Sequence, residues 1–209
     1  MPIAVFPIGP LETNAYVLHE QQDAVVVDPG GDMRGGLTRI LDFLSQNTLT
    51  LQAVLLTHLH FDHVLGVAQL VEACPGVKVY ASCDDDAILR SSFSGSMWGM
   101  PPVRSFEYED MLPGEYSFGA INLRTMSTPG HSAGSLSFYL PQEDSVIVGD
   151  LLFYRSVGRT DLPGSDHPKL EASLRTHIYT LPPQTKAYPG HGPETVTGDE
   201  KKLNPFVRG

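Results

Sequence analysis

The sequence has few cysteines, no long apolar run and no surplus of basic residues. Cys74 and Cys83 are the only cysteines, and they form neither a C-x-x-C pair nor a disulfide framework. No apolar stretch reaches the roughly 18 residues that suggest a membrane-spanning helix. With 14 basic and 24 acidic residues the net charge is -10, so we expect neither nucleic acid nor an anionic membrane as a partner.

A recognisable leader and a long linker are also missing. Residues 1–10 lack the basic and apolar regions of a signal peptide, so we expect a cytoplasmic protein. No tract rich in Pro, Ser and Gly divides the chain. The apolar fraction of 41% over 209 residues is sufficient for a sizeable core. The sequence therefore predicts a single domain over residues 1–209.

Short apolar runs separated by Gly and Pro predict strands with helices inserted between them. The predicted strands are residues 3–8, 14–18, 24–27, 53–57, 77–81, 121–126, 135–140, 145–148 and 185–188. The predicted helices are residues 37–44, 64–71, 84–90 and 168–181. The strands fall into two groups with helices in each, which predicts an α/β fold of two mixed sheets face to face with helices outside, in four αββα layers. Ligands would then gather at one edge, where strands end.

The segment 91–113 is long and shows no periodicity. It contains Phe93, Met97, Trp98 and Met100. A connection of this length is often functional, and an aromatic and methionine cluster on the surface is typical of a lid or of a contact between subunits. The sequence does not choose between these two interpretations, and it leaves the oligomeric state open.

The six residues His58-Leu59-His60-Phe61-Asp62-His63 hold four potential metal ligands directly after a predicted strand. Imidazole and carboxylate suit zinc, iron and related divalent metals. If the chain stays extended here, His58, His60 and Asp62 point the same way, and His63 points towards a second metal. The alternative is a solvated turn that is rich in histidine.

Further ligands must come from elsewhere in the chain, because these four residues cannot complete two coordination shells. His131, Asp150 and His191 each follow a predicted strand and have Gly directly before them. Taken singly, each could be an ordinary loop residue. Together they predict two divalent metal ions, zinc first, with iron or manganese possible. The predicted first set is His58, His60 and His131. The second set is Asp62, His63 and His191, with Asp150 as the bridge.

Two metal ions at one site predict hydrolysis. A water between two divalent cations loses its proton near neutral pH, which gives a bridging hydroxide. A substrate carbonyl or phosphoryl oxygen on one metal is polarised towards attack. Asp150 would bridge the ions, and Asp62 would orient the hydroxide. We therefore interpret Asp62 and Asp150 as the catalytic carboxylates.

The histidine cluster, followed in order by Gly130-His131, Gly149-Asp150 and Gly190-His191, resembles the signature of the metallo-β-lactamase superfamily. Within it the chain is similar to short, single-domain glyoxalase II-like members at residues 10–16, 28–31, 158–164, 189–195 and 204–206. The resemblance implies an αββα sandwich that acts on a small molecule, a thioester such as S-D-lactoylglutathione, and releases D-lactate and glutathione. It disfavours a lactamase proper, because Asp150 stands where many two-zinc lactamases have a cysteine.

The chain departs from longer glyoxalase II enzymes at two places. Those enzymes continue into a helical domain that binds the glutathione carboxylates, whereas this chain ends at Gly209. Arg159 stands at a lysine position that contacts glutathione there, but Asp161 replaces a tyrosine. The residues predicted to contact substrate are Arg159 and Tyr154, although both could be plain surface residues.

The main alternative function is oxidative. Persulfide dioxygenases share this fold and the segment Gly158-Arg159-Thr160-Asp161. They resemble the chain but use one iron, held at the positions of His58, His131 and Asp150. Iron with open positions activates oxygen, whereas two metals make hydroxide.

Overall fold

The computed structural model describes residues 1–31, 36–89 and 99–209. In this part of the chain the strands form two six-stranded sheets and a small hairpin. The first sheet has the order β1-β2-β3-β4-β5-β6. Its strands are β1 (Ile3–Ile8), β2 (Thr13–Glu20), β3 (Asp23–Val27), β4 (Thr50–Leu55), β5 (Lys78–Ala81) and β6 (Glu109–Asp110). β1, β2 and β3 are antiparallel, and β3 to β6 are parallel.

Helical crossovers explain the parallel half of the first sheet, since parallel neighbours need a long connection. The helix α1 (Gly36–Gln46) joins β3 to β4, and the helices α2 (Phe61–Val64) and α3 (Val67–Ala73) join β4 to β5. A 3-10 turn and the helix α4 (Asp86–Leu89) follow β5.

The second sheet has the order β14-β13-β10-β9-β8-β7 in the described residues. Its strands are β7 (Gly114–Phe118), β8 (Ile121–Ser127), β9 (Leu136–Leu140), β10 (Ser145–Gly149), β13 (Lys186–Pro189) and β14 (Thr195–Val196). Only β10 and β13 are parallel among these neighbours. Between them lie the hairpin β11 (Leu152–Phe153) and β12 (Ser156–Val157), the helix α5 (His167–Ser173) and a π-helical stretch, Leu174–Ile178. The helix α6 (Thr197–Leu203) follows β14.

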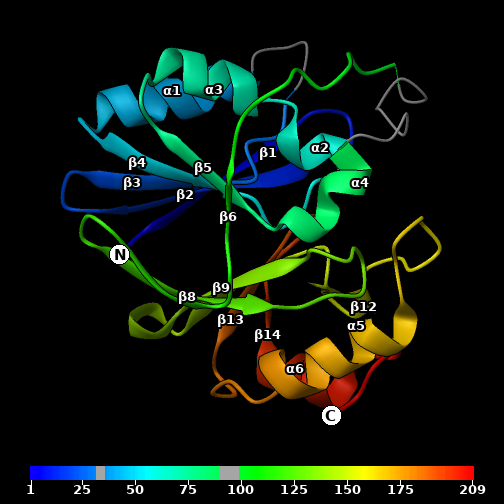
Figure 1. The fold of residues 1–209 in the computed structure, drawn as a ribbon. Helices are drawn as coiled ribbons and strands as arrows, with labels where there is room; N and C mark the ends of the chain where they lie inside the picture. The colour runs from blue at the N-terminus through cyan, green and yellow to red at the C-terminus, as the bar shows by residue number, and fades with distance from the viewer. Residues whose placement is uncertain (32–35, 90–98) are drawn as a thin grey trace.

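The four-layer αββα fold is confirmed. Figure 1 shows α1 and α3 on the outer face of the first sheet, and α5 and α6 on the outer face of the second. Tyr16, Leu55 and Phe138 are fully buried in the apolar cluster between the sheets, and two further clusters lie under the helices. Strands that are buried on both faces read as continuous apolar runs, which is why they were visible in the sequence.

Several elements differ from the predicted ones. The predicted helix 168–181 is α5 followed by a π-helical stretch, and β4 ends at Leu55, two residues before the predicted end. The strand β7, the hairpin β11–β12 and the helix α6 were not predicted. In segment 91–113, Phe93, Met97 and Trp98 lie outside the described residues, whereas Met100 is buried. Among the helices of the described part, none is long and apolar enough to cross a membrane.

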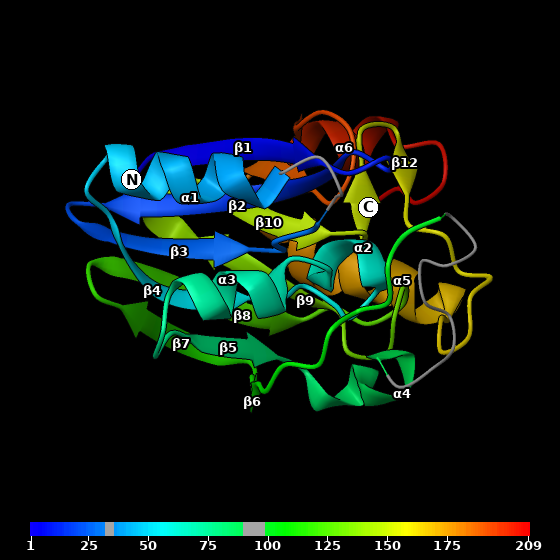
Figure 2. The same ribbon diagram turned by 90° about the horizontal axis from the view of Figure 1, so that it is seen from above.

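One edge of the sandwich collects the loops that carry the predicted ligands. Seen from above in Figure 2, β3, β4 and β10 end on the side where α2, β12 and α5 lie. The residues that follow β4, β10 and β13 include His58, Asp150 and His191. Parallel strands direct their carboxyl ends to one edge, so residues distant in sequence meet there.

Candidate metal centre

The histidine cluster changes conformation in its middle. His60 directly precedes α2 and is extended, with φ -67° and ψ 146°. Asp62 and His63 then lie in α2. The condition that the chain stays extended through Asp62 is therefore not met. Because a helix turns by about 100° per residue, Asp62 does not point the same way as His58 and His60.

The structure brings the seven predicted ligands together in three overlapping groups. Within each group the ligand atoms lie within 4.8 Å of one another. The groups are His58, His60 and His131; His58, His63 and Asp150; and Asp62, His63 and His191. The first and third groups have the same members as the two predicted sets. That these residues bind metal stays a prediction.

Asp150 lies between the two sets. Its Oδ1 is 3.5 Å from Nε2 of His63, and its Oδ2 is 3.5 Å from Nε2 of His131 and 3.6 Å from Nε2 of His191. The preceding Gly149 has φ +52°, in the left-handed region that favours glycine. This geometry lets one carboxylate face both sets, as the predicted bridging role requires.

Hydrogen bonds to the outer nitrogens orient the imidazole rings. Nδ1 of His63, His131 and His191 each lies 2.9 Å from a protein oxygen, which belongs respectively to the Asp28 carboxylate, the Arg159 carbonyl and the Leu11 carbonyl. Nδ1 of His58 lies 3.0 Å from Oγ1 of Thr57. A proton on Nδ1 leaves the lone pair on Nε2, and this is the usual arrangement of a metal-binding histidine. These four rings therefore direct Nε2 into the cluster.

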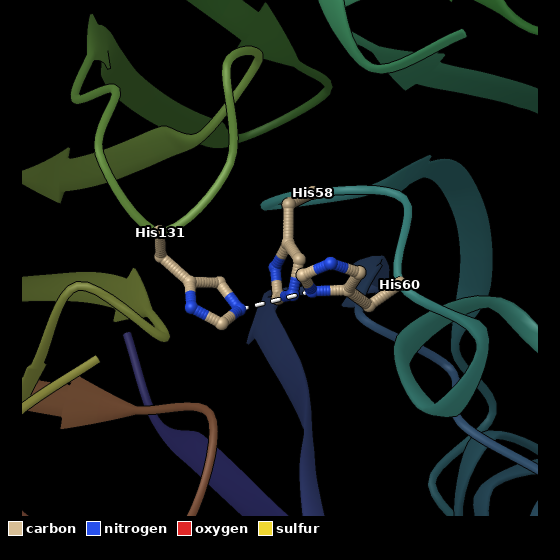
Figure 3. Close-up of side chains that lie close together, drawn as sticks. All are labelled: His58, His60 and His131. Atoms are coloured by element: carbon tan, nitrogen blue, oxygen red, sulfur yellow. Dashed lines mark hydrogen bonds between the residues drawn. The ribbon is translucent and has the colours of Figure 1, made fainter. Parts of the chain in front are cut away.

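His60 differs from these four histidines, because it directs Nδ1 rather than Nε2 towards the cluster. Its Nδ1 lies 2.9 Å from Nε2 of His131, as the dashed line in Figure 3 marks, and the ring of His58 lies beside both. All three side chains are buried. Three imidazole nitrogens from two loops, the one after β4 and the one after β8, thus face one point in the protein interior.

Three buried atoms of the cluster have no hydrogen-bond partner: Nε2 of His58, Nε2 of His63 and Oδ1 of Asp150. A buried polar atom without a partner is costly, so such atoms are rare in folded proteins. Each of the three is a nitrogen or oxygen atom of a kind that binds divalent zinc, iron or manganese. The residues present therefore fit two divalent ions.

The pKa values of three of the buried histidines are shifted in opposite directions. Burial and the neighbouring His131 lower the pKa of His60 to about 3, and burial with the other imidazoles holds the pKa of His58 well below its ordinary value. Both are neutral at pH 7, the form that binds metal. Burial also acts to lower the pKa of His63, but the carboxylates of Asp62, Asp28 and Asp150 outweigh it and raise this pKa to about 10.

The sequence analysis missed two residues that hold the cluster in place. Asp28 directly follows β3 with φ +49°. Its Oδ1 accepts a hydrogen bond from the Thr57 amide at 2.7 Å, and its Oδ2 accepts one from Thr57 Oγ1 at 2.6 Å in addition to the bond from His63. On the opposite side, Thr13 Oγ1 donates to Oδ2 of Asp62 at 2.8 Å. The available signal for Asp28 is an acidic residue directly after a buried strand. In the sequence analysis this residue appears only within the segment 28–31 that resembles glyoxalase II-like members.

Asp85 is a third missed residue, and it connects the two loops of the first set. Its carboxylate accepts hydrogen bonds from the Leu59 amide at 3.2 Å, the Gly134 amide at 2.6 Å and Ser132 Oγ at 2.8 Å. Leu59 lies between two predicted ligands, and Ser132 follows His131. Asp85 is itself buried, so this link is shielded from water.

A cavity of about 450 Å³ opens beside the cluster. It is lined by Leu11, His60, Phe61, Asp62, His131, Asp150, Phe153, Ser156, Val157, Arg159, Leu162 and His191. Arg159 is thus placed where it could meet a substrate. Tyr154 is not among the lining residues described: its side chain is 54% exposed, and its ring lies under the Arg155 guanidinium. Its contact with substrate stays a prediction.

Comparison with known proteins identifies relatives along almost the whole chain. Residues 8–191 match the family model described as the metallo-beta-lactamase superfamily. The probable metallo-hydrolase YqgX of Bacillus subtilis is 37% identical, over 97% of this chain and 96% of its own length. Hydroxyacylglutathione hydrolase GloC of Haemophilus influenzae is 30% identical, over 99% of this chain and 98% of its own length.

Solved structures show the same similarity. BLEG-1, described as a B3 metallo-beta-lactamase, superimposes with a TM-score of 0.90 at 36% identity and 100% coverage of both chains. TTHA1623, solved in a di-iron-bound form, gives 0.84 at 40% identity, with 95% of this chain and 97% of that chain covered. ETHE1 from Myxococcus xanthus gives 0.80 at 28% identity, with 99% and 84% covered.

Proposed function

Because this chain belongs to the metallo-beta-lactamase superfamily, we propose that it is a metal-dependent hydrolase that cleaves a thioester such as S-D-lactoylglutathione with two divalent ions bound. The observation that carries the proposal is the convergence of seven nitrogen and oxygen ligands, Asp150 among them, in three overlapping groups, with three buried ligand atoms left without hydrogen-bond partners. The similarity to a hydroxyacylglutathione hydrolase over 99% of the chain supports the thioester as substrate.

In this proposal His58, His60 and His131 would hold one ion, Asp62, His63 and His191 would hold the other, and Asp150 would be shared by both. We expect zinc to be the preferred metal, and the same ligands also suit iron or manganese. Two divalent cations supply a water molecule of lowered pKa and polarise the carbonyl of a bound thioester.

The protein side chains then have distinct tasks. The Thr13 hydroxyl donates a hydrogen bond to Oδ2 of Asp62. Oδ1 of the same carboxylate is then available to accept a hydrogen bond from the attacking water and to orient it. Phe61 and Phe153 line the cavity next to Asp62, where they exclude bulk water from the reacting carbonyl. The thiol leaves with a proton when the carbon–sulfur bond breaks, so the products are a carboxylic acid and a free thiol.

The proposal is tested with protein purified without added metal and then loaded with zinc, iron or manganese. We expect two ions per chain by elemental analysis and hydrolysis of S-D-lactoylglutathione. A β-lactam and a phosphodiester complete the panel, because BLEG-1 is described as a lactamase. Turnover of the β-lactam or the phosphodiester with no turnover of any thioester would refute the proposed reaction.

A mono-iron persulfide dioxygenase is the second candidate. Nε2 of His131 lies 3.5 Å from Oδ2 of Asp150, and His58 shares one ligand group with each of them, so these three residues can also hold a single iron. One iron per chain together with sulfur-dependent oxygen uptake would favour this candidate over the hydrolase.

A further inference from the structure

The cavity beside the cluster has an apolar wall and little positive charge. The apolar side chains that line it are Leu11, Phe61, Phe153, Val157 and Leu162. Among the described lining residues, Arg159 is the one lysine or arginine. Any recognition of a substrate carboxylate in this part of the chain therefore depends on whether Arg159 is available.

Arg159 is already paired. Its Nε lies 2.7 Å from Oδ1 of Asp161, and its Nη2 lies 2.8 Å from Oδ2 of the same carboxylate. This two-pronged contact is the strongest geometry for an arginine and a carboxylate. The backbone of Arg159 is also fixed, because its carbonyl accepts the hydrogen bond from His131. The guanidinium therefore stays close to the cavity. The side chains of Arg159 and Asp161 are largely exposed, at 58% and 69%, and the carboxylate offsets the charge of the guanidinium.

Arg155, the other arginine near the cavity, is also paired with a carboxylate. Arg155 lies between the two strands of the hairpin that brings Phe153 and Ser156 to the cavity. Its Nη1 binds Oε1 of the fully buried Glu200 at 3.0 Å. In the described residues around this cavity, both arginines are therefore paired with a carboxylate.

We propose that Asp161 determines the specificity of this site by cancelling the charge of Arg159, so that the site recognises the acyl half of a thioester and accepts uncharged thiols as readily as glutathione. Glutathione carries two carboxylates, which gain from binding only where an unpaired cation meets them. The net charge of -10 adds no attraction for them. This inference rests on the proposed thioester hydrolysis.

The test compares two thioesters that share the lactoyl group: S-lactoylglutathione and the uncharged S-lactoyl-N-acetylcysteamine. We expect the wild-type kcat/KM values to agree within about threefold, and Asp161→Asn to shift their ratio roughly threefold to tenfold towards the glutathione thioester. Salt should reduce this shift. The double variant Asp161→Asn/Arg159→Gln should restore the wild-type ratio. Asp144→Asn, which removes a carboxylate at the opposite end of β10, is the matched control.

A binding measurement separates this inference from the proposed reaction. S-methylglutathione is a thioether and cannot be hydrolysed as a thioester. We expect calorimetry to show a Kd for metal-loaded Asp161→Asn that is roughly threefold to tenfold lower than for the wild type. Tighter binding with neither thioester cleaved would refute the hydrolase and support the role of Asp161. The inference is overturned if the wild type prefers S-lactoylglutathione by more than about thirtyfold. It is also overturned if S-methylglutathione binding is unchanged or undetectable in Asp161→Asn.

Discussion

Asp28 and His63 are joined in the protein interior by a hydrogen bond of 2.9 Å between Oδ2 and Nδ1, and their side chains are 1% and 0% exposed. The same carboxylate holds the amide and the hydroxyl of Thr57, the residue directly before His58. One side chain at the end of β3 thus fixes the start of the ligand loop and the tautomer of one proposed ligand.

Replacing Asp28 should weaken metal binding without removing any ligand. Asp28→Asn keeps the shape of the side chain but puts an amide where His63 and Thr57 now donate, so His63 loses its fixed orientation. We expect metal affinity to fall roughly tenfold to a hundredfold, measured by competition with a chelator. Asp42→Asn, an exposed carboxylate on α1, is the control, and equal affinities for the two variants would contradict this role.

Asp150→Ala should remove the bridge between the two sets. Because Asp150 lies within 3.6 Å of Nε2 in His63, His131 and His191, its loss leaves each set one donor short. We expect the metal content to fall by at least one ion per chain and hydrolysis to be abolished. Full retention of both the metal content and the turnover in the purified variant would rule out the bridging assignment.

The ligand positions were predictable because they depend on strand ends. His131, Asp150 and His191 follow the strands β8, β10 and β13 of the second sheet. The carboxyl ends of parallel strands meet at one edge of a sheet. The partnership of Asp28 with His63 was not predictable from spacing. It arises because β3 lies beside β4 in the sheet, which brings residues 35 positions apart into contact. The exposure of Tyr154 was not predictable for a related reason: the direction of a side chain in a hairpin depends on packing.

Gly190→Ala tests how closely the backbone approaches the cluster. A Cβ atom added at Gly190 would overlap Oδ1 of Asp150 and would lie 2.8 Å from Cε1 of His63. Either the carboxylate or the imidazole must move, so we expect at least roughly a tenfold loss of metal affinity or of kcat/KM. Gly114→Ala, where the nearest atom would be 3.8 Å away, should leave both values unchanged. Wild-type values in Gly190→Ala would show that the cluster is looser than the structure indicates.

Asp85 should contribute to stability through the two loops that it joins. Asp85→Ala leaves the buried amides of Leu59 and Gly134 and the hydroxyl of Ser132 without their acceptor. Each unsatisfied group costs about 1–3 kcal/mol, so we expect the free energy of unfolding to fall by roughly 3–5 kcal/mol, measured by urea denaturation of the metal-free protein. The measurement uses metal-free protein because this separates the effect of the lost hydrogen bonds from the effect of any lost metal ions. A decrease below about 1 kcal/mol would mean that water replaces Asp85 at these donors.

Metal removal should reveal how much of the stability the ions supply. The partnerless Nε2 of His58 and Oδ1 of Asp150 are buried in the cluster, and a ligand that binds only the folded protein stabilises it by about 4 kcal/mol at a thousand times its Kd. For a chain of this size we expect zinc to raise the Tm of chelator-treated protein by roughly 10 °C. The rise should be smaller in Asp150→Ala, because that variant lacks the carboxylate shared by both sets. If the Tm of the wild type were the same with and without zinc, the buried donors would have to be satisfied in some other way, and the assignment of these residues as metal ligands would fail with it.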